Sequence, residues 1–376
     1  MAYTFRYVTT NIYQSGSSAN PVIAEMPFTG VNFTQQLNSI GTFQGNVLLS
    51  GINSTNLNVY NGTTPGKTIL WVIYNDTESS NSYPVWSGVI WNREYDSENQ
   101  ILSITAQEML SLYQRRRISD TKTYTAQDPT YIAQNLMQYT EAKSYGKTGL
   151  TYSVASSAFA TTKTYNNYEF KSVYQAVKDL AQNFFDFAII PYVSGSTLYN
   201  EFTIGIPLGT PYSSINPTSA VFQFPGNVIS YRFPEDGISA ANRLYGLGYG
   251  ANAKKLITTA VDSAKYTDGF PLLEDAVNYI DIGDQTLLNN TTLGHLNAIS
   301  YPPTTVEIVI PTYVDPYYYT HYSIGDTVQV RINDDYFPTG LSLILRIVGM
   351  SVNPGENGPD RVTLTLTREL ASGSVV

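Results

Sequence analysis

An alternating pattern near the C-terminus constrains the fold more than any other feature of this sequence. Residues 325–370 read GDTVQVRINDDYFPTGLSLILRIVGMSVNPGENGPDRVTLTLTREL. Apolar residues occupy every second position in three runs, around Val330, Leu345 and Leu364, and polar turns rich in Asn, Asp, Pro and Gly separate the runs. A period of two is typical of strands with one buried face. The pattern predicts a three-stranded antiparallel meander, which needs further strands to cover its apolar face and its free edge.

The same pattern occurs once earlier in the chain. Residues 66–110 read GKTILWVIYNDTESSNSYPVWSGVIWNREYDSENQILSITAQEML. Both copies open with Gly-x-Thr, contain a mid-strand glycine (Gly88 or Gly349), and end with Glu-Met-Leu or Arg-Glu-Leu. Upstream, residues 28–51 match residues 224–248, with Phe-x-Gly at the front and a short Asn- and Leu-containing run at the back. Because these segments recur in the same order, the sequence predicts an internal duplication.

The two copies differ in the length of chain between their upstream and downstream parts, which is much longer in the second copy. We infer that a small domain is inserted there. The sequence therefore predicts a mainly β fold with α+β parts, in which two duplicated antiparallel β-barrels carry two smaller peripheral domains. The predicted domains are a first barrel over residues 1–113, an α+β domain over 114–206, a discontinuous second barrel over 207–250 and 305–376, and a small inserted domain over 251–304.

Helical signals appear between the two predicted barrels and within the insertion. Asp128 followed by Pro129 is a favourable helix start, since Asp caps free amide groups and Pro suits the first turn. Apolar residues at helical spacing follow Ser172, and a turn at residues 194–196 joins two strands. A further helix is predicted at residues 285–299.

Composition limits the possible functions. Charged residues make up 14% of the chain, and the net charge is −9, whereas about 25% charged residues is usual for soluble domains. The 31 tyrosines and the low charge are typical of interface surfaces, although tyrosine and threonine are also common in strands. The acidic balance gives no basic patch for nucleic acid or anionic membrane. The N-terminus shows no secretion signal, and no apolar run has transmembrane length.

Two glycine-containing stretches resemble nucleotide-binding motifs but lack the required context. Residues 246–251 fit G-x-G-x-x-A, yet no parallel βαβ unit follows, so the glycines are interpreted as the exit point of the insertion. Residues 61–68 (NGTTPGKT) differ from a phosphate-binding loop at the first glycine and lead into a strand instead of a helix. The second stretch is interpreted as a turn that opens a strand. No cofactor is predicted.

Candidate catalytic and metal-binding residues are few. The chain has no cysteine and only two histidines, His295 on the polar face of a predicted helix and His321 in a Tyr-rich run. Neither has a second ligand nearby in sequence. Two stretches could bind calcium through side-chain oxygens, namely Asn333-Asp334-Asp335 and Asp281 with Asp284, but acidic turns are far more common. The sequence therefore predicts no catalytic, cofactor-binding or metal-binding residues.

The remaining conspicuous residues are given structural interpretations. Glu94 and Asp96 are assigned to a β-hairpin, and the three arginines at residues 115–117 to a solvated or interface turn. The aromatic residues in the run 317–319 and at Trp86 and Trp91 could bind sugars by stacking, but packing or a subunit contact is the preferred interpretation.

The predicted architecture and the two repeated strings resemble the minor tail proteins of long-tailed phages. The chain is similar over about residues 1–370 to the baseplate-hub, or tail-associated, family of siphophages, particularly those that infect actinobacteria. The resemblance implies a homotrimer whose six barrels form a ring between a six-fold tail tube and a three-fold tip. It implies a structural, non-enzymatic virion protein at the tail tip with a central DNA exit channel.

The resemblance also implies partners. These are other copies of the chain, a distal tail protein or tail-tube ring, the tape measure protein, and a downstream tip or receptor-binding protein. The acidic balance favours a channel lumen along which DNA slides without sequence-specific binding. Many relatives carry C-terminal enzyme or fibre modules, and none is predicted in this chain. The alternative hypothesis is a surface carbohydrate-binding β protein, such as an adhesin, which the aromatic and Asn content would also suit.

Overall fold

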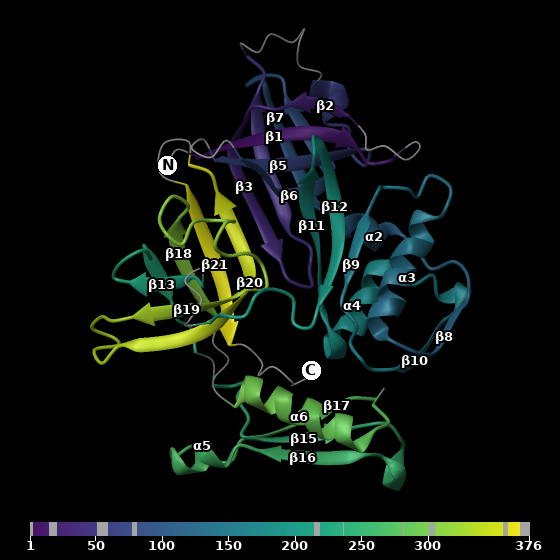
Figure 1. The fold of residues 1–376 in the computed structure, drawn as a ribbon, viewed down its shortest axis with the longest axis vertical. Coiled ribbons are helices and arrows are strands. Elements are labelled where there is room, and N and C mark those ends of the chain that lie inside the picture. Colours follow the sequence, from purple (N-terminus) through teal and green to yellow (C-terminus); the bar gives the residue numbers. More distant parts are fainter. Residues whose placement is uncertain are drawn as a thin grey trace.

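The computed structural model describes residues 3–14, 21–50, 59–76, 81–213, 219–235, 237–280, 282–300, 305–355 and 360–368. The fold is mainly β, as the sequence predicts, and is built around one large sheet of thirteen strands (Figure 1). Three smaller sheets and several helices complete the described part of the chain.

The first half of the large sheet comes from the N-terminal part of the chain. Its strands lie in the order β3 (Phe28–Gln36), β4 (Thr42–Leu48), β7 (Ile101–Glu108), β6 (Ser82–Asp96), β5 (Thr68–Asp76), β1 (Tyr3–Asn11) and β2 (Val22–Glu25). All neighbours in this half are antiparallel. This half of the sheet is curled. Its outer strands approach each other, since Tyr7 of β1 contacts Phe28 of β3 with ring centroids 5.5 Å apart.

The second half comes from the C-terminal part of the chain. Its strands lie in the order β14 (Ser230–Arg232), β18 (Val306–Pro311), β21 (Arg361–Arg368), β20 (Leu341–Asn353), β19 (Thr327–Ile332) and β13 (Val221–Phe224). Neighbours are antiparallel except β13 and β19, which are parallel.

The strand order of the first half, β3-β4-β7-β6-β5-β1, recurs in the second half as β14-β18-β21-β20-β19-β13. The predicted meanders are therefore present twice in equivalent positions. A bulge in β6 lies just after Ile90, and a bulge in β20 lies just after Ile347. The amide of Gly66 donates to the Ile90 carbonyl at 2.8 Å, and the amide of Gly325 donates to the Ile347 carbonyl at the same distance. This correspondence in hydrogen bonding is evidence for an internal duplication.

Two details of the predicted duplication are wrong. Gly88 pairs with Glu108, whereas Gly349 lies beyond the bulge and pairs with Thr365, so the two glycines are not equivalent. The run at residues 243–247, which was matched to β4, forms β15 in a separate sheet, and β18 occupies the position equivalent to β4. Alternation identifies a strand, but it does not identify the strand's partner.

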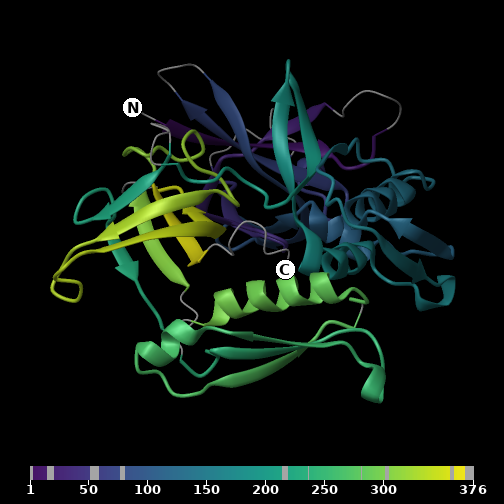
Figure 2. The same cartoon turned by 60° about the horizontal axis from the view of Figure 1, so that its bottom comes forward.

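The insertion is consequently larger than the sequence predicts and begins after β14. Its sheet has the order β16 (Ile257–Val261), β15 (Arg243–Leu247) and β17 (Glu274–Asn278), with α6 (Gln285–Ile299) packed on one face (Figure 2). The short elements η2 (Asn252–Lys254) and α5 (Ser263–Thr267) lie in its connections. The core beneath α6 contains Leu244, Ala260 and Leu296. The predicted boundary at residue 251 is wrong, because β15 pairs within the insertion.

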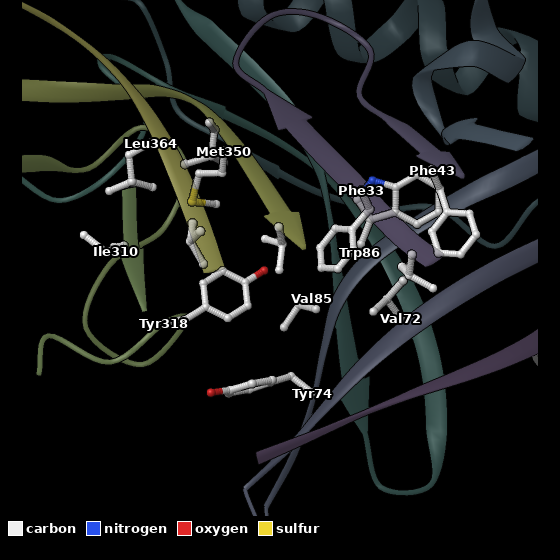
Figure 3. Close-up of a cluster of buried hydrophobic side chains, with 14 of the residues drawn as sticks. Phe33, Phe43, Val72, Tyr74, Val85, Trp86, Ile310, Tyr318, Met350 and Leu364 are labelled. Atoms are coloured by element: carbon white, nitrogen blue, oxygen red, sulfur yellow. The ribbon is translucent and has the colours of Figure 1, made fainter. Parts of the chain in front are cut away.

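The two halves of the large sheet join through β3 and β20, which pair antiparallel from Phe33 with Val352 to Gln36 with Gly349. One hydrophobic core extends across both halves (Figure 3). Within it, Tyr74 of the first half and Tyr318 of the second meet edge to face, with ring centroids 5.4 Å apart. Among the described residues, the hydrogen-bonded path runs from β14 to β2 without returning on itself, so the two closed barrels stay a prediction.

An α+β region packs against the first half. It contains α2 (Leu110–Arg115), β8 (Lys122–Gln127), α3 (Pro129–Glu141), β9 (Thr151–Val154), β10 (Thr161–Tyr165), η1 (Asn167–Glu169), α4 (Val173–Phe184), β11 (Asp186–Ser194) and β12 (Thr197–Gly205). The side chains of Asp128 and Ser172 cap α3 and α4, as the sequence predicts for the first of these helices. A short helix, α1 (Val59–Gly62), precedes β5.

Strand β5 connects the α+β region to the first half of the large sheet, because it contributes side chains to the cores of both. Its residues alternate between two cores: Leu70 and Val72 face the core of the large sheet, whereas Ile69 and Trp71 face the core shared with α3, α4, β11 and β12. A strand that is buried on both faces has a nearly continuous apolar sequence, as ILWVIY shows.

Candidate functional site

The two nucleotide-like motifs have structural roles. In β15, a Cβ atom at Gly246 would lie 1.9 Å from Oγ1 of Thr292, so glycine permits the close approach of α6 to the sheet. The stretch at residues 61–68 ends α1 and turns into β5, and Gly66 has φ +69°. That region of φ favours glycine. The interpretation of residues 61–68 as a strand-opening turn is confirmed.

The acidic candidates act in turns and caps. Asp334 accepts hydrogen bonds from the amides of Tyr336 and Phe337, both at 3.0 Å, and Asp284 caps α6 by accepting from the Leu287 amide at 2.8 Å. Asp281 lies outside the described residues. Asp96 accepts from the Glu98 amide at 2.9 Å in the β6–β7 hairpin, which confirms the hairpin interpretation.

The histidines lie in separate places. His295 is half-buried, not on a polar face, and its Nδ1 lies 2.7 Å from the hydroxyl of Tyr279. Burial lowers the pKa of His295. His321 lies with Nδ1 3.0 Å from a carboxylate oxygen of Asp315. Within the described ranges, no group of three His, Asp or Glu residues is arranged to hold a metal ion, and no helix is both long and apolar enough to span a membrane.

The aromatic candidates are mostly internal. Trp86 and Tyr318 are fully buried, and the indole nitrogen of Trp86 donates to the Thr34 carbonyl at 3.0 Å. Trp91 is partly buried and donates to Ser111 at 2.8 Å. The packing interpretation is confirmed for Trp86 and Tyr318, and these rings are not available to stack on a sugar.

A largely buried ionic junction joins three parts of the molecule and is the candidate site for a structural role. Arg346 of β20 donates to Asp186, at the start of β11, at 2.6 Å, and both side chains are about 15% exposed. Arg346 also donates to the carbonyls of Leu208 at 2.6 Å and Gly325 at 3.0 Å. The other oxygen of Asp186 accepts from the side-chain amide of Asn38 at 2.7 Å, in the β3–β4 turn. We call these five residues the junction.

The junction fixes the two halves and the α+β region in one arrangement. Asn38 completes it from the first half: its side-chain oxygen accepts from the Phe187 amide at 2.7 Å, and its backbone amide donates to the Phe187 carbonyl at 3.2 Å. Asn38 has φ +58°, a conformation that Asn tolerates better than most residues. Arg346 and Asp186 are largely buried, so each needs the other as its partner. An uncompensated buried charge strongly destabilises a fold.

A second buried acid closes the β3–β4 turn. Glu108, at the end of β7, accepts from the Gly41 amide at 2.6 Å and forms no ion pair with the described residues. Burial raises the pKa of Glu108 to about 8. A Cβ at Gly41 would lie 1.9 Å from the Thr34 carbonyl oxygen, so the turn closes tightly on this carboxyl.

Sequence reasoning did not identify the junction or Glu108. The available signals were weak: Arg346 interrupts the apolar run LILRIV, and Asp186 separates Phe185 from the apolar run FAII. A single charge in a strand usually points to solvent. Only the pairing of β3 with β20 and the position of β11 bring these distant residues together.

Comparisons with known proteins agree with the architecture. No protein-family model and no curated protein matches the sequence. Among solved structures, a tail protein from Neisseria meningitidis is 11% identical with a TM-score of 0.62, covering 98% of this chain and 99% of that chain. The 43 kDa tail protein of prophage MuSo2 from Shewanella oneidensis is 10% identical with a TM-score of 0.62, covering 99% of this chain and all of that one.

A third solved structure extends the likeness. The prophage tail protein gp18 from Listeria monocytogenes is 13% identical with a TM-score of 0.56, covering 96% of this chain and 94% of that chain. At these identities the comparison concerns the fold, and it covers almost the whole length of each chain. The protein therefore shares its fold with phage and prophage tail proteins.

Proposed function

We propose that this protein is a structural, non-enzymatic component of a phage tail, and specifically the hub at the tip of a siphophage tail. The observation that carries the proposal is the repeated strand order of the two halves, with equivalent bulges at Ile90 and Ile347. The likeness in fold to three tail proteins over nearly the whole chain supports it.

The duplication suits an adaptor between unequal symmetries. A closed ring of three identical chains presents three copies of any surface. When each chain contains two similar halves, the ring presents six similar surfaces on one side while keeping three-fold symmetry elsewhere. Such a trimer would join a six-fold tail tube to a three-fold tip, with the distal tail protein, the tape measure protein and a receptor-binding protein as neighbours.

The core shared by the two halves supports a structural role, and so does the junction. β3 and β20 pair directly, so the two halves share one sheet, and the contacts of Asp186 with Arg346 and Asn38 connect both halves to the α+β region. The net charge of −9 favours a channel through which DNA passes without adhering. In this proposal the protein is located at the tip of the virion tail.

The solution mass of the purified protein tests the proposal. Light scattering is expected to give a species near three times the chain mass of 41.6 kDa. A compact monomer that persists at high protein concentration, and that does not assemble when tail-tube protein is added, would overturn the trimeric hub.

A further inference from the structure

A pocket beside the first half brings together cationic side chains from two segments that are separate in sequence, the nucleotide-like loop and the triple arginine. It encloses about 620 Å³, and its lining includes Lys67 from the nucleotide-like loop and Arg117 from the triple arginine. The segment that follows β1 is hydrogen-bonded to both sides of the pocket region: the Ile12 amide donates to the Lys67 carbonyl at 2.9 Å, and the Gln14 amide donates to the Lys147 carbonyl at 3.0 Å.

Four cationic side chains line this pocket, and no Asp or Glu stands among its described lining residues. Arg116 is neutralised by Glu141 at 2.5 Å, with both side chains 14% exposed. The amine of Lys143 donates to the Arg117 carbonyl and to Ser119, both at 2.8 Å. These two cations are therefore already engaged by the protein.

The other two cations have no such partner. The side chains of Lys67 and Arg117 are exposed, and neither forms an ion pair or a side-chain hydrogen bond with the described residues. In a chain of net charge −9, two free cations on the lining of one concave site produce a local positive potential.

Aromatic rings form another part of the pocket. Tyr13 and Tyr145 lie with ring centroids 5.7 Å apart, and they are 44% and 84% exposed. Tyr145 has φ +60°, so the backbone presents its ring in an uncommon conformation for a residue other than glycine. Exposed tyrosines beside cations are typical of sites that recognise peptides, because they give large contact areas and bind with little loss of side-chain entropy.

We propose that this pocket binds an acidic peptide segment of a partner protein, with carboxylates at Lys67 and Arg117 and an apolar or aromatic side chain against Tyr13 and Tyr145. The proposal does not depend on the trimeric hub. Nucleic acid is the less suitable occupant, because a polyanion needs a continuous basic track, whereas the surrounding chain is acidic.

Fluorescence anisotropy with a labelled peptide tests this inference on the full chain. The probe GSEYDSEGS copies the spacing of carboxylates around tyrosine in the exposed hairpin at residues 94–98, and GSQYNSQGS is its neutral control. We expect the acidic peptide to bind at least about tenfold more tightly than the neutral one, with an affinity that falls as salt rises.

Charge reversal locates the binding. K67E combined with R117E is expected to weaken peptide binding by at least about tenfold, since it replaces attraction by repulsion at both contacts. The matched control is K254E combined with R361E, which reverses one exposed lysine and one exposed arginine outside the pocket. The control should leave affinity unchanged, and circular dichroism should be unaltered in both variants.

Three results would overturn the proposal. The first is no binding of the acidic peptide at low salt by a wild-type protein with native circular dichroism. The second is an equal loss of affinity in the two double variants, which would indicate only a long-range charge effect. The third is a short oligothymidylate or inorganic phosphate that binds more tightly than the peptide and loses binding in K67E/R117E, which would assign the pocket to phosphate.

Discussion

The two halves of the large sheet share a strand order but differ at their attachments. In the first half a short turn joins β3 to β4, and Glu108 is buried against it. In the second half the insertion separates β14 from β18, and Arg368, which is equivalent to Glu108, is exposed. β1 is antiparallel to its neighbour β5 in the first half, whereas the equivalent strand β13 is parallel to its neighbour β19 in the second.

This comparison shows which features of a duplicated fold stay fixed. The meander and its bulge are kept because apolar alternation sets the register on both sides of the sheet, and a one-residue slip would expose the whole buried face. Connections and edges lie at the surface and accept insertions more easily. The two halves therefore differ at their connections and sheet edges, where the insertion is attached.

The junction gives the largest expected effect of any single change. Replacing Arg346 by Met removes the cation and leaves Asp186 buried without its countercharge, which should lower the free energy of unfolding by about 4 kcal/mol. Urea unfolding of the purified protein measures the loss.

An exposed ion pair provides the matched control. Arg232 and Glu307 lie 3.7 Å apart, with side chains 74% and 41% exposed. Replacing Arg232 by Met should cost at most about 1 kcal/mol. Equal losses for the two substitutions would mean that the buried junction stabilises the fold no more than an exposed ion pair does.

Substitution at the two bulges tests the equivalence of the halves directly. Ile90 and Ile347 are fully buried at matching positions. Ile90→Ala and Ile347→Ala should each lower the free energy of unfolding by about 3 kcal/mol, because each removes a buried branched side chain and leaves a cavity. Thermal and urea unfolding measure both. A large loss at one site with none at the other would contradict the structural equivalence.

Glu108 should make the stability of the first half depend on pH, with no counterpart at the exposed Arg368. The pKa of Glu108 is raised from 4.5 to about 8 by burial. The folded state therefore binds this proton more tightly than the unfolded state, so the contribution of Glu108 to stability is full below pH 4.5 and is lost as pH rises through about 8.

Glu108→Gln removes this titration while keeping an oxygen for the Gly41 amide. Relative to the variant, the wild type should lose about 2 kcal/mol of stability between mildly acidic and mildly alkaline pH, after allowance for relaxation around the buried group. Unfolding titrations at a series of pH values measure the difference. Parallel pH profiles for the two proteins would refute it.

The smallest predicted effect concerns the insertion, which exists only in the second half. Because burial lowers the pKa of His295 below 6.5, the folded state disfavours its protonation. Stability of the insertion should therefore be full above pH 6.5 and decrease as pH falls through the lowered pKa. Hydrogen exchange of α6 amides at two pH values measures this, and His295→Gln should flatten the dependence. A lower protection factor of wild-type α6 at the higher pH, with each rate divided into the intrinsic base-catalysed rate at that pH, would contradict the sign.

The sequence predicted the elements much better than their connections. Both meanders, the capped start of α3 and the full length of α6 are visible in local patterns of apolar and capping residues. The transfer of β15 to the insertion was not predictable, because its alternation would suit either sheet. The junction was also hidden, since Asn38, Asp186 and Arg346 are far apart in sequence and meet only through tertiary packing.

Electron microscopy of the assembled protein tests the central claim most directly. Class averages along the channel axis should show a ring of six similar lobes, alternating between first and second halves, with true three-fold symmetry and a central opening. A ring with three lobes only, or particles whose two halves face different sides of the assembly, would contradict the proposal that the duplication adapts six-fold to three-fold symmetry.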